Sequence, residues 1–357
     1  MILKNALLNG NICDIEINNG TIINIGKSNN EGIDLKGNKV YAGLIEIHAH
    51  GCIGEDTMDG NNLDKMSVYQ AENGITSWYP TTMTMPYDTL RKVVNVDLSK
   101  VKGANVLGFH LEGPHIAMKY KGGQNPEYVT PPSIDEFNTL KNAGLVTVAP
   151  EVEGGYDFIK KCKAVVCLGH TEANYDEGIK AFKCGAKCLT HTFNAMPPLH
   201  HRNPGVIGAA IEENAYAQVI CDGMHIHPAT VKALYKMFTS DRMIIISDTL
   251  RAADLPEGEY EIGGQLCTMK NGLCRLKDGT IAGSTTNLFK CVQKVISFGI
   301  DADEAFKMAS LTPATLMGID DKKGTVEVGK DADLIVVDKD YNLLLSMVGG
   351  TIYKNII

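Results

Sequence analysis

The sequence lacks the long apolar run that a membrane-spanning helix needs. No stretch of its 357 residues approaches the roughly 18 consecutive apolar residues required. The N-terminus has no charged segment followed by a long apolar one, as a secretory signal would have. The 10 cysteines are scattered and form no organised set of pairs. These absences predict a cytoplasmic protein in a reducing compartment, with no membrane contact.

The chain also lacks a dense stripe of lysine and arginine. Its formal net charge is −8, so it has no electrostatic footprint for nucleic acid or an acidic membrane surface. Any anionic ligand must therefore be bound by local groups. Hydrophobic residues make up 44% of the chain, which is enough for a large core and suits a barrel with a small companion domain.

The two ends of the chain share a strand-like pattern. Residues 1 to about 40 alternate apolar and polar positions, with Asn19-Gly20 as a turn signal. Similar alternation returns in residues 324–330 and 333–338. We therefore expect residues 1–42 and 325–357 to form one β-sandwich domain.

Residues 43–324 follow a different rhythm, in which short runs rich in Val, Ile and Leu alternate with amphipathic segments of helix length. This pattern is typical of repeated βα units around a parallel sheet. The expected strands cover residues 43–48, 75–79, 105–112, 145–149, 164–170, 187–191, 216–221 and 243–248. They predict an α/β fold, a (β/α)₈ TIM barrel, with a β excursion near residues 257–280. We expect Gly144 and Gly185 to mark helix C-termini.

Polar side chains fall where the expected strands end, the face on which barrel enzymes carry their chemistry. They are His48 and His50 after the first strand, Glu112 after the third, His170 after the fifth, His191 after the sixth, His225 after the seventh and Asp248 after the eighth. Residues i and i+2 of a strand share a face, so the first two imidazoles would lie side by side. Any one of these residues could be a structural histidine or a solvated acid, but agreement at six strand ends favours a site.

The residue types narrow the chemistry. Imidazole and carboxylate groups without an organised thiolate set favour Zn²⁺, Fe²⁺, Co²⁺ or Mn²⁺ at an open, catalytic site. Such an ion lowers the pKa of bound water from about 15.7 to about 7 and polarises a carbonyl, as amide or ester hydrolysis at neutral pH requires. Asp248 is then the candidate proton shuttle. For Cys184 and Cys188 we expect a structural role.

These residues carry a resemblance that extends along nearly the whole chain. The His-x-His pair, the later ligands and the final Asp resemble the amidohydrolase superfamily and, within it, the N-acetylglucosamine-6-phosphate deacetylases. The matching stretches are residues 108–114 (GFHLEGP), 168–171 (LGHT), 190–196 (THTFNAM), 222–225 (DGMH), 311–314 (LTPA) and 329–334 (GKDADL). The LEGP and NAM segments are specific, whereas GKDADL occurs in many amidohydrolases.

The resemblance implies a main metal held by Glu112, His170 and His191. His48 and His50 would support a second ion, with Glu112 between the two, so the expectation is one or two divalent ions per subunit. Many relatives bridge two metals with a carboxylated lysine after the fourth strand. Here residues 147–151 contain no lysine, and Glu112 can take that role. Some family members replace the histidine pair and use a single metal.

The resemblance also implies contacts with the substrate. Asn194, Ala195 and Arg202 would bind a sugar phosphate, with Arg202 reaching into the neighbouring subunit of a homodimer. His225 would contact the substrate near its acetyl carbonyl. Without the resemblance, a solvated loop position is the preferred interpretation of Arg202. The sugar pocket would be lined by Gly123, Gln124, Ile281, Ala282 and Gly283.

The sequence departs from the family pattern at three places. Gln124 stands where some members have a histidine that contacts the substrate, Thr249-Leu250 replaces a small residue and methionine, and Asp254 stands where glycine is common. These changes leave the expected hydrolytic machinery intact and bear on fine substrate preference. No role is assigned to His200 or His201, and structural roles are expected for His110, His115 and His227.

The expected activity is metal-dependent hydrolysis of the acetamide of N-acetyl-D-glucosamine 6-phosphate to D-glucosamine 6-phosphate and acetate, in amino-sugar catabolism or recycling. His225 would help to stabilise the oxyanion, and Asp248 would protonate the leaving nitrogen. The alternatives are the galactosamine 6-phosphate epimer or another amidohydrolase reaction, such as cyclic-amide opening. From a different class, the chain could be an inactive sugar-phosphate-binding barrel. The intact set of metal ligands and Asp248 argues against that reading.

Overall fold

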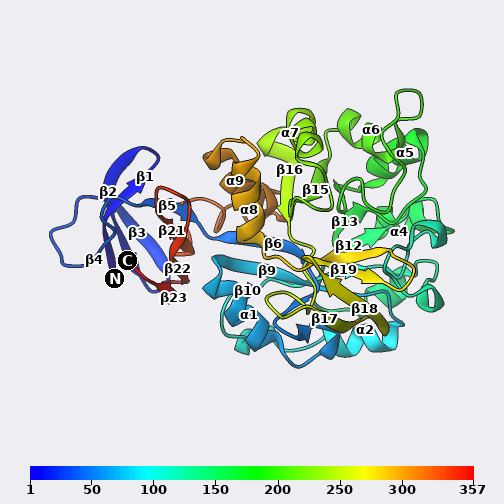
Figure 1. Ribbon diagram of the computed structural model, residues 1–357, viewed down its shortest axis with the longest axis horizontal. Helices are drawn as coiled ribbons and strands as arrows, with labels where there is room; N and C mark the ends of the chain where they lie inside the picture. The colour runs from blue at the N-terminus through cyan, green and yellow to red at the C-terminus, as the bar shows by residue number, and fades with distance from the viewer.

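The computed structural model describes residues 1–357. A barrel forms one end of the molecule, and strands from both chain termini form a smaller β-rich unit at the other, where the N- and C-termini lie close together (Figure 1). Both the predicted barrel and the predicted β-rich unit built from the two termini are therefore confirmed. No helix has the length and apolar character needed to cross a membrane.

Eight parallel strands form the barrel in chain order. They are β6 (Leu44–Ala49), β9 (Ile75–Thr82), β11 (Phe109–Glu112), β12 (Ala143–Val148), β13 (Val165–Leu168), β14 (Cys188–Leu189), β15 (Tyr216–Ile220) and β16 (Met243–Ile246). The segment that follows β16 closes the barrel onto β6. The Asp248 amide donates to the His48 carbonyl at 3.0 Å, and the His50 amide donates to the Thr249 carbonyl at 2.8 Å. The closing bonds therefore run through the residues expected to carry the chemistry.

The strand expected over residues 105–112 is divided in two. A short edge strand, β10 (Asn105–Val106), pairs with β9, and β11 begins after Gly108. Gly108 has φ of 149°, and a Cβ there would lie 2.9 Å from the Asn142 carbonyl oxygen. A glycine is needed for this close approach, and it lets the chain change direction between the two strands.

Helices surround the barrel. They are α1 (Leu63–Glu72), α2 (Tyr87–Val94), α3 (Ile134–Phe137), α4 (Gly155–Lys161), α5 (Tyr175–Cys184), α6 (Gly205–Glu212), α7 (Pro228–Arg242), α8 (Leu288–Ser297), α9 (Ala302–Met308) and α10 (Leu311–Met317). Gly185 follows α5 as its C-cap, as expected. The expectation for Gly144 was wrong. It lies inside β12, because α3 ends at Phe137 and the chain turns through Asn142, whose side-chain amide donates to the Val94 and Val96 carbonyls.

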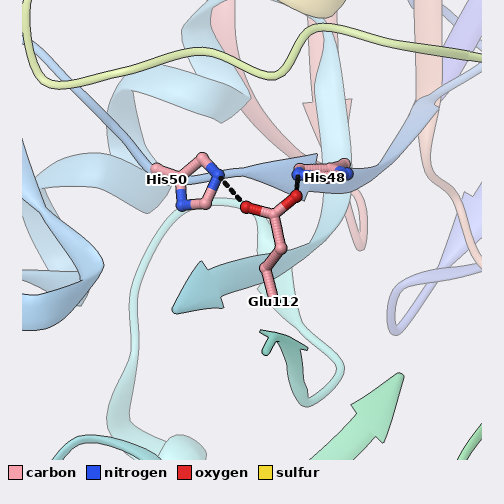
Figure 2. A group of neighbouring side chains, drawn as sticks. All are labelled: His48, His50 and Glu112. Carbon is pink, nitrogen blue, oxygen red and sulfur yellow. Dashed lines mark ion pairs between the residues drawn. The ribbon is translucent and has the colours of Figure 1, made fainter. Parts of the chain in front are cut away.

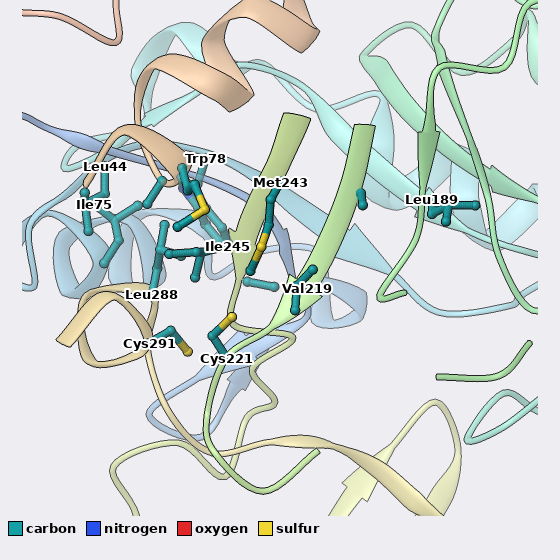
Figure 3. Close-up of a cluster of buried hydrophobic side chains, with 14 of the residues drawn as sticks. Leu44, Ile75, Trp78, Leu189, Val219, Cys221, Met243, Ile245, Leu288 and Cys291 are labelled. Carbon is teal, nitrogen blue, oxygen red and sulfur yellow. The ribbon is translucent and has the colours of Figure 1, made fainter. Parts of the chain in front are cut away.

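Alternate residues of each barrel strand pack on opposite sides. Met243 and Ile245 of β16 face outward and belong to the same core cluster as Leu288 and Cys291 of α8 (Figure 3). Ile244 and Ile246 face inward and join a separate interior cluster that includes Ala314 and Leu316 of α10. The barrel interior next to α10 is thus filled with apolar side chains, and the polar groups collect at the C-terminal ends of the strands. All 10 cysteines are free thiols.

The strands at the chain ends form one sheet. They are β1 (Ile2–Leu8), β2 (Asn11–Asn18), β3 (Thr21–Gly26), β4 (Ile33–Asp34), β5 (Lys39–Ala42), β21 (Leu334–Val337), β22 (Leu343–Val348) and β23 (Thr351–Asn355), in the order β23-β22-β21-β5-β1-β2-β3 with β4 on β1. The Ile22 amide donates to the Lys330 carbonyl and the Ala332 amide to the Gly20 carbonyl, so β3 returns to the segment before β21. The predicted sandwich is therefore a single sheet folded over one core.

A second small sheet lies beside the barrel mouth. It consists of β17 (Gly258–Ile262), β18 (Gln265–Lys270), β19 (Leu273–Leu276) and β20 (Ile281–Ser284), all antiparallel. The Ser284 amide donates to the Asp248 carbonyl at 2.9 Å, which joins β20 to the rim. The remaining short elements are β7 (Gly51–Cys52), β8 (Glu55–Asp56) and the 3₁₀ helices η1 (Thr57–Asp59), η2 (Leu98–Lys100), η3 (Met118–Tyr120) and η4 (Pro126–Tyr128).

Candidate active site

His48 and His50 point at the same carboxylate. His48 Nε2 lies 3.2 Å from Glu112 Oε1, and His50 Nε2 lies 3.2 Å from Glu112 Oε2 (Figure 2). The three residues are 0%, 2% and 3% exposed. Together they form one group whose ligand atoms could hold a metal ion.

A β-bulge sets the direction of the first histidine. Glu46 pairs with Trp78 and Ala49 with Pro80, so β6 has one more residue than β9 across this interval. Bulges are typical beside active sites, because they redirect a side chain. The His48 amide donates to Glu46 Oε1 at 3.0 Å, which holds the bulge.

Glu46 also joins the first strand to the last. Its second oxygen, Oε2, accepts from the Ser247 amide at 3.1 Å. The side chain is fully buried, and burial raises its pKa to about 7, although the hydrogen bonds from Ser247 and His48 oppose that shift. An acid inside the apolar run LIEIH was a visible signal, but we did not predict its role.

A second group shares Glu112. Its Oε1 lies 3.2 Å from His170 Nε2 and 3.0 Å from His191 Nε2, and the two nitrogens are 3.0 Å apart. The structure thus brings together all five residues expected as metal ligands, in two groups that have Glu112 in common.

The Nδ1 atoms of His170 and His48 point away from Glu112, and their hydrogen bonds show whether a cation would fit at the Nε2 atoms. His170 Nδ1 lies 2.7 Å from the Tyr120 carbonyl oxygen, and His48 Nδ1 lies 3.0 Å from Gln218 Oε1. Both partners are acceptors, so each neutral ring carries its proton on Nδ1 and turns the Nε2 lone pair toward the Glu112 carboxylate. Burial would lower the pKa of His48, but the Glu112 and Asp248 carboxylates raise it, so positive charge is favoured between these rings and oxygens. A divalent cation fits this donor set.

Electrostatics keep the buried carboxylates ionised. Burial alone would raise the pKa of Glu112, but the neighbouring His48 and His170 hold it well below its ordinary value. Burial opposes ionisation of Asp248 in the same way, and His48 and His50 lower its pKa. The ring of His110 beneath the site differs, because burial lowers its pKa well below the ordinary value and it stays neutral.

Asp248 lies directly against the histidine pair. Its Oδ1 is 3.4 Å from His48 Nε2 and 3.4 Å from His50 Nε2. Asp248, His170 and His191 all have positive φ, at 50°, 48° and 27°. Such conformations cost about 1–3 kcal/mol each for residues other than glycine and collect at functional sites.

His225 is oriented by a neighbouring acid. Its Nδ1 lies 2.6 Å from Asp222 Oδ2, while Asp222 Oδ1 accepts from the amides of Met224 and His225 at 2.8 and 2.9 Å. Burial would raise the pKa of Asp222, but the hydrogen bond from His225 keeps it below its ordinary value. Nδ1 is thereby committed to Asp222, and Nε2 is the ring nitrogen left for a ligand.

One cavity is lined by many of these groups, although not by His48 and His50. Its walls include the metal-ligand candidates Glu112, His170 and His191, the expected acid–base groups Asp248 and His225, and the expected substrate contacts Gly123, Gln124, Asn194, Ala195, Ile281, Ala282 and Gly283. Residues 40–356 match the amidohydrolase family.

The chain belongs to the amidohydrolase family. It is 37% identical over 329 residues to N-acetylglucosamine-6-phosphate deacetylase of Bacillus subtilis, and the alignment covers 87% of this chain and 83% of that protein. It is 34% identical over 322 residues to N-acetylgalactosamine-6-phosphate deacetylase of Escherichia coli O157:H7, covering 86% of this chain and 85% of the relative. The crystal structure of N-acetylglucosamine-6-phosphate deacetylase from Thermotoga maritima superimposes with a TM-score of 0.92, at 30% identity and with 100% of both chains covered.

The side chain of Gln124 forms hydrogen bonds to two protein groups in this amidohydrolase. Its side-chain Nε2 donates to Glu112 Oε2 at 2.5 Å, and its Oε1 accepts from the Thr84 amide at 2.7 Å. The side chain lines the cavity, but both of its polar atoms are engaged by protein groups. It therefore orients Glu112 in addition to any contact with the substrate.

The fold places Arg202, which was expected to contact the substrate phosphate, outside the cavity. It is exposed, its Nη1 lies 2.6 Å from His201 Nε2, and it borders an outer groove with Glu172 and Asp176 rather than the cavity. In the folded chain it does not meet the other site residues.

Asp254, where the sequence departs from the expected glycine, lies in the left-handed backbone region. Its φ is 56°, which glycine adopts freely and Asp tolerates. Here the carboxylate accepts from Tyr69 Oη at 2.5 Å and from Lys290 Nζ at 2.7 Å. These bonds tie the loop after Asp248 to α1 and α8.

Several cavity residues were not predicted. They are Lys119, Tyr120, Gly122, Ile220 and Thr280. Gln218, which orients His48, was also missed, although a polar residue within the apolar run of β15 was a usable signal. Tyr120 acts through its carbonyl, which no side-chain pattern reports.

Proposed function

We propose that the protein hydrolyses the acetamide of N-acetyl-D-glucosamine 6-phosphate to D-glucosamine 6-phosphate and acetate. One observation carries the proposal: both oxygens of Glu112 lie among four histidine nitrogens at the base of a cavity, with Asp248 at the same point. Relatives that align with most of the chain are named for this deacetylation. The reaction would belong to amino-sugar catabolism or recycling in the cytoplasm.

The main ion would be held by Glu112, His170 and His191, and a second by His48 and His50 with Glu112 shared. Bound there, a divalent ion such as Zn²⁺, Fe²⁺, Co²⁺ or Mn²⁺ supplies Lewis acidity and an acidified water. The Tyr120 carbonyl and the Gln218 amide keep two of the imidazoles turned inward. Preorganised ligands of this kind raise metal affinity, because less order must be imposed on binding.

Asp248 would move the proton. Its carboxylate is ionised, since the neighbouring histidines lower its pKa, so it can accept a proton from the attacking water. It would then donate that proton to the departing nitrogen. His225, fixed through Asp222, would place Nε2 at the acetyl carbonyl and, when that nitrogen is protonated, donate a hydrogen bond to the developing oxyanion.

The walls of the cavity would select the sugar. Gly123, Gln124, Ile281, Ala282 and Gly283 would line the ring, and Asn194 with Ala195 would face the phosphate. Arg202 would complete the phosphate site from the neighbouring subunit of a homodimer, where its guanidinium can pair with two phosphate oxygens. The exposure of Arg202 supports this assignment, because it leaves the side chain free to reach another subunit.

A second candidate is the galactosamine epimer. The relative from Escherichia coli O157:H7 named for that substrate is nearly as similar as those named for glucosamine. Comparing kcat/KM for the two N-acetylhexosamine 6-phosphates decides between them.

The test is acetate release from N-acetylglucosamine 6-phosphate, with metal content measured on the same sample. Release that stops on chelation and returns with Zn²⁺, Fe²⁺ or Co²⁺ is the expected result. No release from a fully metal-loaded protein would refute the glucosamine assignment. Release from the galactosamine epimer in that sample would favour the second candidate.

A further inference from the structure

A chain of hydrogen bonds crosses the barrel interior through His110. His110 Nδ1 lies 3.2 Å from Thr81 Oγ1, and His110 Nε2 lies 2.8 Å from Thr147 Oγ1, which is 2.8 Å from Thr190 Oγ1. The four residues come from β9, β11, β12 and the segment after β14, and each is 0% exposed. A fully buried polar chain of this kind holds its members in one arrangement, because every broken bond leaves an unsatisfied group.

Each end of this chain reaches a metal-ligand segment. Thr81 Oγ1 accepts from the Ala49 amide at 2.9 Å, and Ala49 is the residue between the two histidines of β6. Thr190 immediately precedes His191. His110 also packs edge to face against His48, with ring centroids 4.5 Å apart. One imidazole thus contacts the supports of both metal groups.

Donors and acceptors can be assigned in one direction along the whole chain of hydrogen bonds. Thr190 donates to Thr147, which donates to His110 Nε2; His110 Nδ1–H then donates to Thr81, whose hydroxyl donates to the Tyr79 carbonyl at 3.4 Å. In the opposite direction the Thr190 hydroxyl hydrogen has no acceptor among these groups. The neutral imidazole donates once and accepts once, so it spans the gap between two hydroxyls that face it from opposite sides.

We propose that His110 is a positioning residue for the metal centre: through Thr81 and Thr147 it holds the His48/His50 pair in register with His191. The inference deepens the proposed function and rests on it for the identity of the metal ligands. It assigns a task to a residue for which the sequence suggested only a structural role.

The test uses three single variants of the full chain and the double variant that combines His110→Phe with Thr147→Val. His110→Phe keeps a ring against His48 but removes both nitrogens, and Thr147→Val removes the next hydroxyl with little change of shape. Thr76→Val is the matched control, because Thr76 is also a buried β9 residue and its hydroxyl donates to the Leu44 carbonyl at the opposite end of the strand. Zn²⁺ affinity of metal-stripped protein is measured by competition with a chromophoric chelator, and kcat and KM with saturating metal.

His110→Phe and Thr147→Val are expected to weaken Zn²⁺ binding by about 10- to 100-fold, the range seen when groups that orient metal ligands are removed. We expect kcat to fall while KM stays within about twofold, since no substrate contact is lost. The double variant should lose no more than the larger single loss, because both changes interrupt one chain. Thr76→Val should change neither quantity.

Zn²⁺ affinities of His110→Phe and Thr147→Val equal to that of Thr76→Val would overturn the proposal. Losses that add in the double variant would also overturn it. If His110→Phe does not fold, the same comparison is made with Thr147→Val alone. Wild-type protein that binds metal but releases no acetate would refute the proposed function, and the affinity comparison would still decide the role of His110.

Discussion

The Nε2 atoms of His170 and His191 lie 3.0 Å apart, and both face Oε1 of Glu112. The Tyr120 carbonyl holds the His170 proton on the far side of its ring, so no hydrogen of that ring points into the triangle. These three ligand atoms are close enough to share one cation, which the negative charge of Glu112 attracts. We therefore expect both the stability and the activity of the protein to depend on metal.

Chelation is therefore expected to stop acetate release and to lower the thermal midpoint, because an ion that binds only the folded state stabilises it. Elemental analysis and calorimetry on the same samples measure both effects. In a His48→Asn/His50→Asn variant we expect one ion fewer per subunit, with the Glu112–His170–His191 group still loaded. An unchanged ion content in that variant would contradict a second ion at the histidine pair.

Asp248→Asn separates proton transfer from metal binding. Asn tolerates the φ of 50° at this position, so the loop should keep its shape and the metal content should stay near normal. We expect kcat to fall by about 10²- to 10⁴-fold, the usual contribution of a positioned acid or base. Asp254→Asn is the matched control, since Asp254 has φ of 56° in the same loop and should retain turnover. Full activity in Asp248→Asn would refute the shuttle.

Arg202 provides a test of the proposed homodimer. Arg202→Ala should raise KM for the phosphorylated sugar, and Asp248→Asn should lower kcat, so each variant alone is impaired. If Arg202 acts across the interface, co-refolding the two variants in equal amounts restores about a quarter of the wild-type sites, because half of the dimers are mixed and each has one intact site. An unrestored mixture, with subunit exchange demonstrated by mass spectrometry, would place Arg202 in its own subunit's site or outside any site.

His115 predicts a pH dependence of stability that is separate from the metal. Its Nδ1 lies 3.0 Å from the Thr130 carbonyl oxygen, its Nε2 lies 2.8 Å from Tyr87 Oη, and burial lowers its pKa from 6.5 to about 4. A depressed folded-state pKa gives a stabilising term that is present above pH 6.5 and is lost as the pH falls toward 4.

The size of that loss can be measured on metal-stripped protein. Between pH 7 and pH 5 we expect this histidine to remove about 2 kcal/mol from the free energy of unfolding, following about 1.36 kcal/mol per pKa unit. Urea unfolding at the two pH values measures it, and His115→Gln should reduce the difference by that amount. An equal pH dependence in wild type and variant would show that His115 does not titrate in this window.

The sequence alone was sufficient for the architecture and for most of the polar residues at the barrel mouth. Eight short runs rich in Val, Ile and Leu, separated by helix-length segments, predict a parallel barrel because hydrophobic periodicity is a local property of the chain. Residues at the C-terminal ends of barrel strands must then share one face, so His48, His50, Glu112, His170 and Asp248 could be grouped before any contact was known.

Only the tertiary structure decided how those side chains meet. The bulge at His48, the Gln218 and Tyr120 groups that turn two imidazoles inward, and the chain through His110 all depend on segments far apart in sequence. The fold also placed Arg202 outside the cavity. Periodicity reports which face of a strand is buried, whereas hydrogen-bond partners and backbone strain are determined by neighbouring strands, and only the folded chain brings those neighbours together.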